Sequence, residues 1–204
     1  MSSASPLVLD GALGTELNNR GIATPLPLWS AEANISDPEI VTEIHKDYAL
    51  AGAEIISTNT FRTTSWTYKK TGLSLKQSKE KAKISLYNAV DCAHKVKNDK
   101  IKIAGSITTI EDCYQPNQFP GEKISEEIYG EVLEGLFDAG VDIFLFETMG
   151  NFQEIKSALI SSQKYELPIW LSIIMKNKEL ILDGTSLRDV LSLLKTYPID
   201  YLLT

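Results

Sequence analysis

The sequence predicts an α/β protein of the (β/α)8-barrel type that is incomplete, with about six βα units. Short apolar runs alternate with amphipathic helical segments over almost all of the 204 residues. The apolar runs lack a polar face, as expected for parallel strands that are buried on both sides. A complete barrel typically has about 250 residues and eight strands. We therefore expect one barrel domain over residues 1–204 without strands seven and eight, although an open doubly wound sheet fits the same pattern.

The predicted strands follow one another at intervals that each leave room for a helix. Right-handed crossovers of this kind connect parallel strands in one sheet. The strands are predicted at residues 7–10, 54–58, 102–107, 142–147, 169–174 and 201–204.

The helices are predicted from capping residues and from apolar side chains on one face. Asp37 followed by Pro38 is a typical helix start, and Ile40, Ile44 and Tyr48 then recur on one side. Four further helices are predicted at residues 74–96, from Ser125 to Ala139, at 151–162 and at 186–195.

A short repeat marks two junctions between a helix and a strand. Ala51-Gly52-Ala53 and Ala139-Gly140-Val141 each precede an apolar run. We expect Gly52 and Gly140 to adopt the left-handed conformation that ends a helix.

Composition excludes several classes of function. The net charge of −7 disfavours nucleic acid and anionic membranes as partners. No apolar run reaches the roughly 18 residues of a membrane span, and residues 1–6 lack the pattern of a signal peptide. We therefore expect a cytoplasmic protein. The chain also lacks a glycine-rich phosphate-binding loop.

Neither the cysteines nor the histidines form a recognisable reactive group. Cys92 lies in a predicted helix and is interpreted as a packing residue, whereas Cys113 lies where active-site loops would be. A structural disulfide is not expected in the cytoplasm. His45 and His94 lie inside predicted helices and are interpreted as surface or packing residues.

Polar residues follow several predicted strands, and parallel α/β folds bind ligands at the carboxyl ends of their strands. Asp10 and Glu147 are the acidic residues at these ends, and together they suit an ammonium group, a metal ion or acid–base chemistry. Asp10 could equally be a turn residue, and Glu147 could cap the following helix. Gly11 could let a ligand approach the backbone or simply form a turn. The segment containing Thr58 and Asn59 could bind a carboxylate or form an ordinary loop.

Several collinear segments together resemble the homocysteine S-methyltransferase family, especially members that use S-methylmethionine or S-adenosylmethionine as the methyl donor. The matching segments are Leu9-Asp10-Gly11-Ala12-Leu13-Gly14-Thr15-Glu16-Leu17, Leu28-Trp29-Ser30-Ala31, Thr58-Asn59-Thr60-Phe61, Ala104-Gly105-Ser106, Phe146-Glu147-Thr148 and Asp183-Gly184-Thr185-Ser186-Leu187-Arg188-Asp189.

This resemblance implies a methyltransferase of methionine biosynthesis, with a zinc ion bound by three cysteine thiolates. Zinc lowers the pKa of the homocysteine thiol, and the thiolate then attacks the methyl group of a sulfonium donor. The resemblance places the homocysteine ammonium at Asp10 and Glu147, and the rest of its amino-acid portion at Thr58, Gly105 and Ser106. It places Trp29 near the methyl donor.

The sequence departs from this family in its cysteines. The cysteine expected after strand six and a later pair are absent, and neither Cys92 nor Cys113 takes their place, so no metal ligand is assigned. Three functions therefore stay open: a methyltransferase homologue, an inactive remnant that binds an amino acid or a partner, and a metal-free lyase or isomerase. In the last, Asp10 and Glu147 would be the acid–base pair. Unpaired edges at strands one and six also predict a homo-oligomer or a complementary chain.

Overall fold

The computed structural model describes residues 6–204, and its centre is a five-stranded parallel sheet. The strands lie in the order β1-β2-β3-β4-β5, so each pairs with the next along the chain. An open doubly wound sheet would reverse this order at its switch point. The sequential order therefore confirms the barrel type, and the barrel is not closed. The strands are β1 (Ile55–Ser57), β2 (Lys102–Ile107), β3 (Ile143–Met149), β4 (Ile169–Ile173) and β5 (Tyr201–Leu203).

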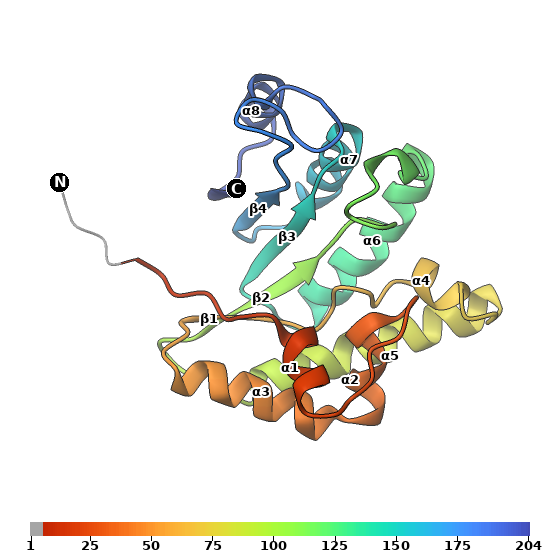
Figure 1. The fold of residues 1–204 in the computed structure, drawn as a ribbon, viewed down its shortest axis with the longest axis vertical. Helices are drawn as coiled ribbons and strands as arrows, with labels where there is room; N and C mark the ends of the chain where they lie inside the picture. The colour runs from red at the N-terminus through yellow and green to blue at the C-terminus, as the bar shows by residue number, and fades with distance from the viewer. Residues whose placement is uncertain (1–5) are drawn as a thin grey trace.

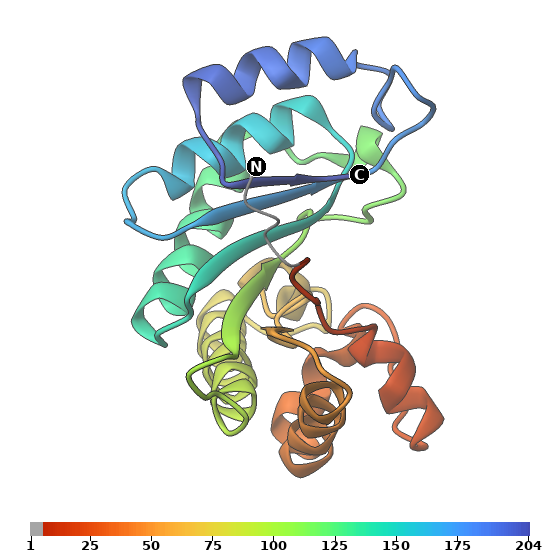
Figure 2. The same cartoon turned by 90° about the vertical axis from the view of Figure 1, so that its left-hand side faces the viewer.

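The helices cover the outer face of this curved sheet (Figure 1). Figure 2 shows the curvature, with α8 (blue) and α1 (red) at opposite ends of the arc. The helices are α1 (Leu13–Asn19), α2 (Ala33–Ser36), α3 (Pro38–Leu50), α4 (Ser65–Lys69), α5 (Leu75–His94), α6 (Glu122–Asp138), α7 (Phe152–Ser162) and α8 (Leu187–Thr196), with short 3-10 helices η1 (Trp29–Glu32) and η2 (Pro116–Gln118).

The prediction of a full strand at residues 7–10 is wrong. Leu9 forms one parallel bridge with Ile55, and the Asp10 N–H donates to the Ile55 carbonyl at 3.0 Å. Leu7, Val8 and Leu9 are 51%, 48% and 40% exposed. This segment pairs on one side only, which explains why the ladder stays short. Residues 1–5, to which the signal-peptide argument applies, lie outside the described part of the chain.

The remaining predicted strands and the five predicted helices are confirmed, with small shifts at their ends. Helix α6 begins at Glu122 and not at Ser125. Gly52 (φ +103°) and Gly140 (φ +82°) have the left-handed backbone that the repeat predicts. The Ser74 hydroxyl and the Gln77 side chain cap the start of α5 reciprocally.

Two apolar layers lie on the two faces of the sheet. The larger layer packs the strands against the helices and includes Ile56, Phe144 and Phe146. The smaller layer fills the concave face, which is the interior of the barrel type, and includes Ala104 and Leu145. Successive strand residues point to opposite faces, so the alternation decides which side chains face inward.

Gly105 faces outward by this alternation, because Ala104 belongs to the inner layer. A Cβ atom at Gly105 would lie 2.9 Å from Leu136 Cδ1, and Leu136 is fully buried on α6. The glycine therefore lets α6 pack closely against β2.

Cys92 and His45 lie away from the carboxyl ends of the strands, and both are packing residues. The Cys92 thiol donates to the Pro38 carbonyl at 3.3 Å. His45 is fully buried, and burial lowers its pKa to about 4. In the part of the chain that the structure describes, every helix is too short or too polar to cross a bilayer.

We predict that Gly105→Ala lowers the free energy of unfolding by about 1–3 kcal/mol, because the added Cβ atom would crowd the buried Leu136 side chain. Gly130→Ala is the matched control, since a Cβ atom there meets nothing within 4 Å. In the middle of α6 the control should gain up to about 1 kcal/mol. Urea denaturation measures both variants, and equal stabilities would contradict the packing role of Gly105.

Candidate functional site

A cavity of about 400 Å³ lies at the carboxyl ends of the strands. Most of the polar residues predicted at strand ends line it, together with residues of the 11–30 and 106–114 segments. Its lining includes Gly11, Gly14, Leu26, Trp29, Ser57, Thr58, Asn59, Phe61, Arg62, Ser106, Asp112, Cys113, Tyr114, Glu147 and Thr148. This is the position where (β/α)8 proteins bind their ligands.

Because alternate residues of each strand face the inner side of the sheet, polar side chains from three strands reach this cavity. Ser57, Ser106 and Glu147 are the next inward positions after Ile55, Ala104 and Leu145, which form the inner apolar layer. The apolar layer is therefore the floor of the cavity, and these polar side chains lie directly above it. Gly105 does not line the cavity, because its Cα faces α6.

Asp10 joins the site from the N-terminal segment that runs beside β1. Its carboxylate accepts hydrogen bonds from the Ser57 N–H and the Ser57 hydroxyl, both at 2.8 Å. The pKa of Asp10 is raised to about 7, mainly by burial and also by the charge of Glu147, while the Ser57 hydrogen bonds oppose the increase. Asp10 and Glu147 are therefore close enough for their charges to interact.

Glu147 lies at a bulge in β3. The pairing between β3 and β4 shifts register between Phe146 and Met149, and Thr148 has φ +55°. A bulge next to a binding site redirects the side chains around it. Burial raises the pKa of Glu147 above its usual value, and the Ser106 side chain partly opposes this. No other protein group within residues 6–204 lowers that pKa, so the carboxylate lacks a cationic partner there.

Thr58 has its hydroxyl occupied by protein groups. Thr60 donates to the Ser106 carbonyl at 2.6 Å, and a carbonyl can only accept. Thr58 must therefore donate to Thr60, at 2.7 Å, while it accepts the Ser106 N–H at 3.1 Å. Thr58 thus ties β1 to β2 at the edge of the cavity.

Asn59 is the centre of a buried network. Its amide nitrogen donates to the Ser30 carbonyl at 2.9 Å and to Asn34 Oδ1 at 2.8 Å, and its oxygen accepts from the Ser30 hydroxyl at 2.6 Å. Both N–H groups are therefore used within the protein. Asn59 fixes the segment that carries Trp29 against the end of β1.

Two glycines let aromatic rings come close to the N-terminal segment. A Cβ atom at Gly11 would lie 2.8 Å from the Tyr48 ring, and one at Gly14 would lie 2.2 Å from Trp29 Nε1. Trp29 itself has φ +51°, which is uncommon for a bulky residue. Gly11 and Trp29 both line the cavity.

Sequence reasoning missed Arg62, Asp112 and Tyr114, which also line the cavity. They lie in loops several residues beyond the strand ends. The only signal in the sequence was a single arginine in an otherwise polar loop. Cys113 is buried at the cavity, as its loop position suggested.

The described residues do not fit the three-thiolate zinc site that the resemblance implies. In residues 6–204, no three His, Cys, Asp or Glu side chains gather closely enough to hold a metal ion. Cys113 faces the cavity, but Cys92 packs between α3 and α5. Tetrahedral zinc sites take their protein ligands from one cluster.

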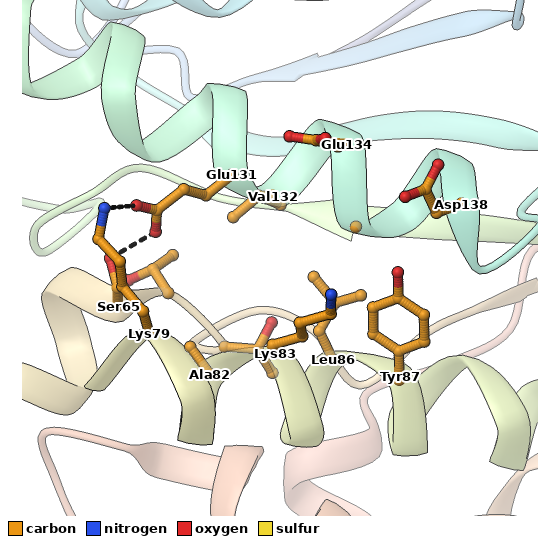
Figure 3. Close-up of a pocket in the computed structure, with 13 residues that line it drawn as sticks. Ser65, Lys79, Ala82, Lys83, Leu86, Tyr87, Glu131, Val132, Glu134 and Asp138 are labelled. Carbon is orange, nitrogen blue, oxygen red and sulfur yellow. Dashed lines mark hydrogen bonds and ion pairs between the residues drawn. The ribbon is translucent and has the colours of Figure 1, made fainter. Parts of the chain in front are cut away.

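A second cavity, of about 320 Å³, lies between α5 and α6 on the outer side of the sheet (Figure 3). Glu131 accepts from the Ser65 hydroxyl at 2.6 Å and pairs with Lys79 at 2.6 Å. These polar groups point toward one another and connect α4, α5 and α6 (Figure 3). We interpret this region as a contact between helices, because it lies away from the strand ends.

A parallel sheet wound strand by strand, with a polar cavity at the carboxyl ends, defines a protein of the (β/α)8-barrel class. The family model described as homocysteine S-methyltransferase matches residues 7–203, and the chain belongs to this family. The metallated form of the homocysteine methyltransferase MmuM from Escherichia coli superposes with a TM-score of 0.89 at 29% identity, over 98% of this chain and 74% of that chain.

The curated relatives are longer than this chain. It is 32% identical to the homocysteine S-methyltransferase of Escherichia coli (strain K12), with 94% of this chain and 66% of the relative aligned. It is 28% identical to homocysteine S-methyltransferase 1 of Arabidopsis thaliana, over 90% of this chain and 63% of the relative. The chain thus spans less than two thirds of the length of both.

We predict that Glu147→Gln lowers the pKa of Asp10, because the negative charge of Glu147 raises it in the wild type. The Asp10 side chain should then lose its proton at a lower pH, although burial keeps its pKa above the usual value. NMR titration of the Asp10 carboxyl carbon measures this shift. Glu134→Gln, on the outer surface, is the control and should leave it unchanged. An unchanged pKa in Glu147→Gln would show that the carboxyl groups do not interact.

Proposed function

We propose that this chain binds homocysteine and takes part in the transfer of a methyl group to its sulfur from S-methylmethionine or S-adenosylmethionine. The observation that carries the proposal is that Asp10, held by the cavity-lining Ser57, lies close enough to the cavity-lining Glu147 for their charges to interact, in a member of this family. As part of it, we place the chain in methionine biosynthesis in the cytoplasm.

The two carboxylates suit an ammonium group for an electrostatic reason. Burial and mutual repulsion raise the pKa of Asp10, and burial raises that of Glu147. A bound cation reverses both effects, because an opposite charge at close range favours the ionised carboxylates. The homocysteine ammonium would therefore gain two charge-assisted hydrogen bonds.

The remaining amino-acid portion would lie against the edge formed by Ser57, Thr58 and Ser106. Ser106 is inward-facing beside Glu147, and its side chain already acts on that carboxylate. Gly11 contributes backbone to the cavity wall, and its missing side chain leaves room for the Tyr48 ring. Gly105 and Asn59, by contrast, would act by positioning their neighbours, since Gly105 faces α6 and the N–H groups of Asn59 are used internally.

Zinc would supply the lowered thiol pKa that methyl transfer in this family requires. Residues 6–204 do not bring together its ligands, so the proposal for this chain rests on amino-acid binding. Amino-acid binding without transfer is the second candidate. It is favoured by the Asp10–Ser57 contacts, which are complete within the chain itself.

We further propose that the open edges associate with a second copy or with a complementary chain. Leu7, Val8, Leu9 and Tyr201 expose large apolar side chains at the two ends of the sheet. Exposed apolar strand edges favour pairing. Sedimentation velocity should show concentration-dependent association, and a stable monomer that does not bind an apolar dye would contradict this.

The main prediction is that L-homocysteine binds to the chain and that Asp10→Asn or Glu147→Gln weakens binding by about 10- to 100-fold, the usual size of a lost hydrogen bond to a charged group. Isothermal titration calorimetry measures the affinities. Glu134→Gln is the control, because this glutamate is exposed on α6.

Equal affinities in all four proteins would contradict the role of the two carboxylates. Absence of homocysteine binding to the wild-type chain would contradict the proposed function itself. Binding without methyl transfer to homocysteine in the presence of zinc and S-methylmethionine would favour the second candidate.

A further inference from the structure

Arg62 carries a charge that the protein leaves almost unpartnered. Its side chain lines the cavity, and its one hydrogen bond within the described residues runs from Nη1 to the Glu111 carbonyl at 3.3 Å. Its Nε is buried without a partner among residues 6–204. The guanidinium also lies 5.7 Å from the centre of the Phe61 ring.

The carboxylate of Glu111, the residue whose carbonyl accepts from Arg62, is engaged by other groups. The Glu111 carboxylate accepts a hydrogen bond from Trp66 Nε1 at 2.7 Å and pairs with Lys70. The Asp112 carboxylate accepts the Tyr114 N–H and the Gln115 amide, and it lies outside ion-pair distance of Arg62. None of the ion pairs within residues 6–204 involves Arg62.

A guanidinium has five N–H donors in a rigid plane, and it matches a carboxylate with two parallel hydrogen bonds. A partly buried guanidinium that makes a single hydrogen bond within the described residues is therefore suited to an anionic ligand. Its place in the cavity wall fixes where that anion would lie.

Arg62 and the carboxylate pair are held by different segments around the cavity. Arg62 donates to the carbonyl of Glu111 in the loop after β2, whereas Asp10 is held by Ser57 at the end of β1. The ammonium and the carboxylate of an α-amino acid share one carbon atom, and the proposed function places both charges of homocysteine beside Asp10 and Glu147. The anion at Arg62 is then assigned to the second substrate.

We propose that Arg62 binds the α-carboxylate of the sulfonium methyl donor and thereby selects donors that contain an amino acid. S-methylmethionine and S-adenosylmethionine share this group, and the proposal applies to both. Asp112, beside Arg62, would receive the donor ammonium. The inference rests on the proposed function, because it assumes that homocysteine occupies the acidic region.

The test is calorimetry on the full chain saturated with L-homocysteine. The two titrants are S-methyl-L-methionine and (3-aminopropyl)dimethylsulfonium, which has the same sulfonium and amine but no carboxylate. Arg62→Gln should weaken binding of S-methyl-L-methionine by about 10- to 100-fold. Arg62→Lys should weaken binding of this donor less, because lysine keeps the positive charge but lacks the planar guanidinium group. The titrant without a carboxylate, (3-aminopropyl)dimethylsulfonium, should bind equally to all three proteins. The affinity for homocysteine should not change.

Several outcomes would overturn the proposal. Unchanged affinity for S-methyl-L-methionine in Arg62→Gln would exclude the contact, as would failure of the wild type to bind this donor. An equal loss for both titrants in a variant with wild-type thermal stability would indicate an indirect effect. A selective loss of homocysteine affinity would assign Arg62 to homocysteine. In all these cases wild-type homocysteine binding keeps the homocysteine site of the proposed function intact, whereas its absence would overturn both.

Discussion

The site depends on one electrostatic constraint, which is the placement of two carboxyl groups close together above an apolar layer. Asp10 and Glu147 come from segments far apart in the chain, and burial raises the pKa of each. Neither is neutralised by a cationic side chain within residues 6–204. An arrangement of this kind opposes stability in the empty protein and becomes favourable when a cation binds.

The fold maintains this arrangement through hydrogen bonds between neighbouring segments. Ser57 holds Asp10 by two hydrogen bonds, Thr58 joins β1 to β2, and Asn59 anchors the segment that carries Trp29. The bulge and the positive φ of Thr148 lie directly beside Glu147. Backbone conformations of this type persist where surrounding contacts hold them in place.

Much of the fold could be predicted from the sequence, because parallel strands buried on both faces appear as short apolar runs. The exception is the segment at residues 7–10, which has the same apolar pattern but only one neighbouring strand. Glu147 could be identified as a site residue, because a carboxylate directly after a buried apolar run must be solvated, paired or bound to a ligand. Gly105 could have been recognised as outward-facing from its place between Ala104 and Ser106. The occupied hydrogen bonds of Asn59, and the guanidinium of Arg62 with its single hydrogen bond among residues 6–204, depend on contacts between distant segments, which a local pattern does not contain.

The most direct test of the account is the number of protons exchanged when homocysteine binds at pH 7. Asp10, with a pKa of about 7, is about half protonated in the empty site. A bound ammonium should displace that proton, so calorimetry in two buffers of different ionisation enthalpy should show the release of about half a proton or more. The release should decrease in Asp10→Asn. Binding without proton release, or with proton uptake, would contradict the placement of the homocysteine ammonium at Asp10 and Glu147.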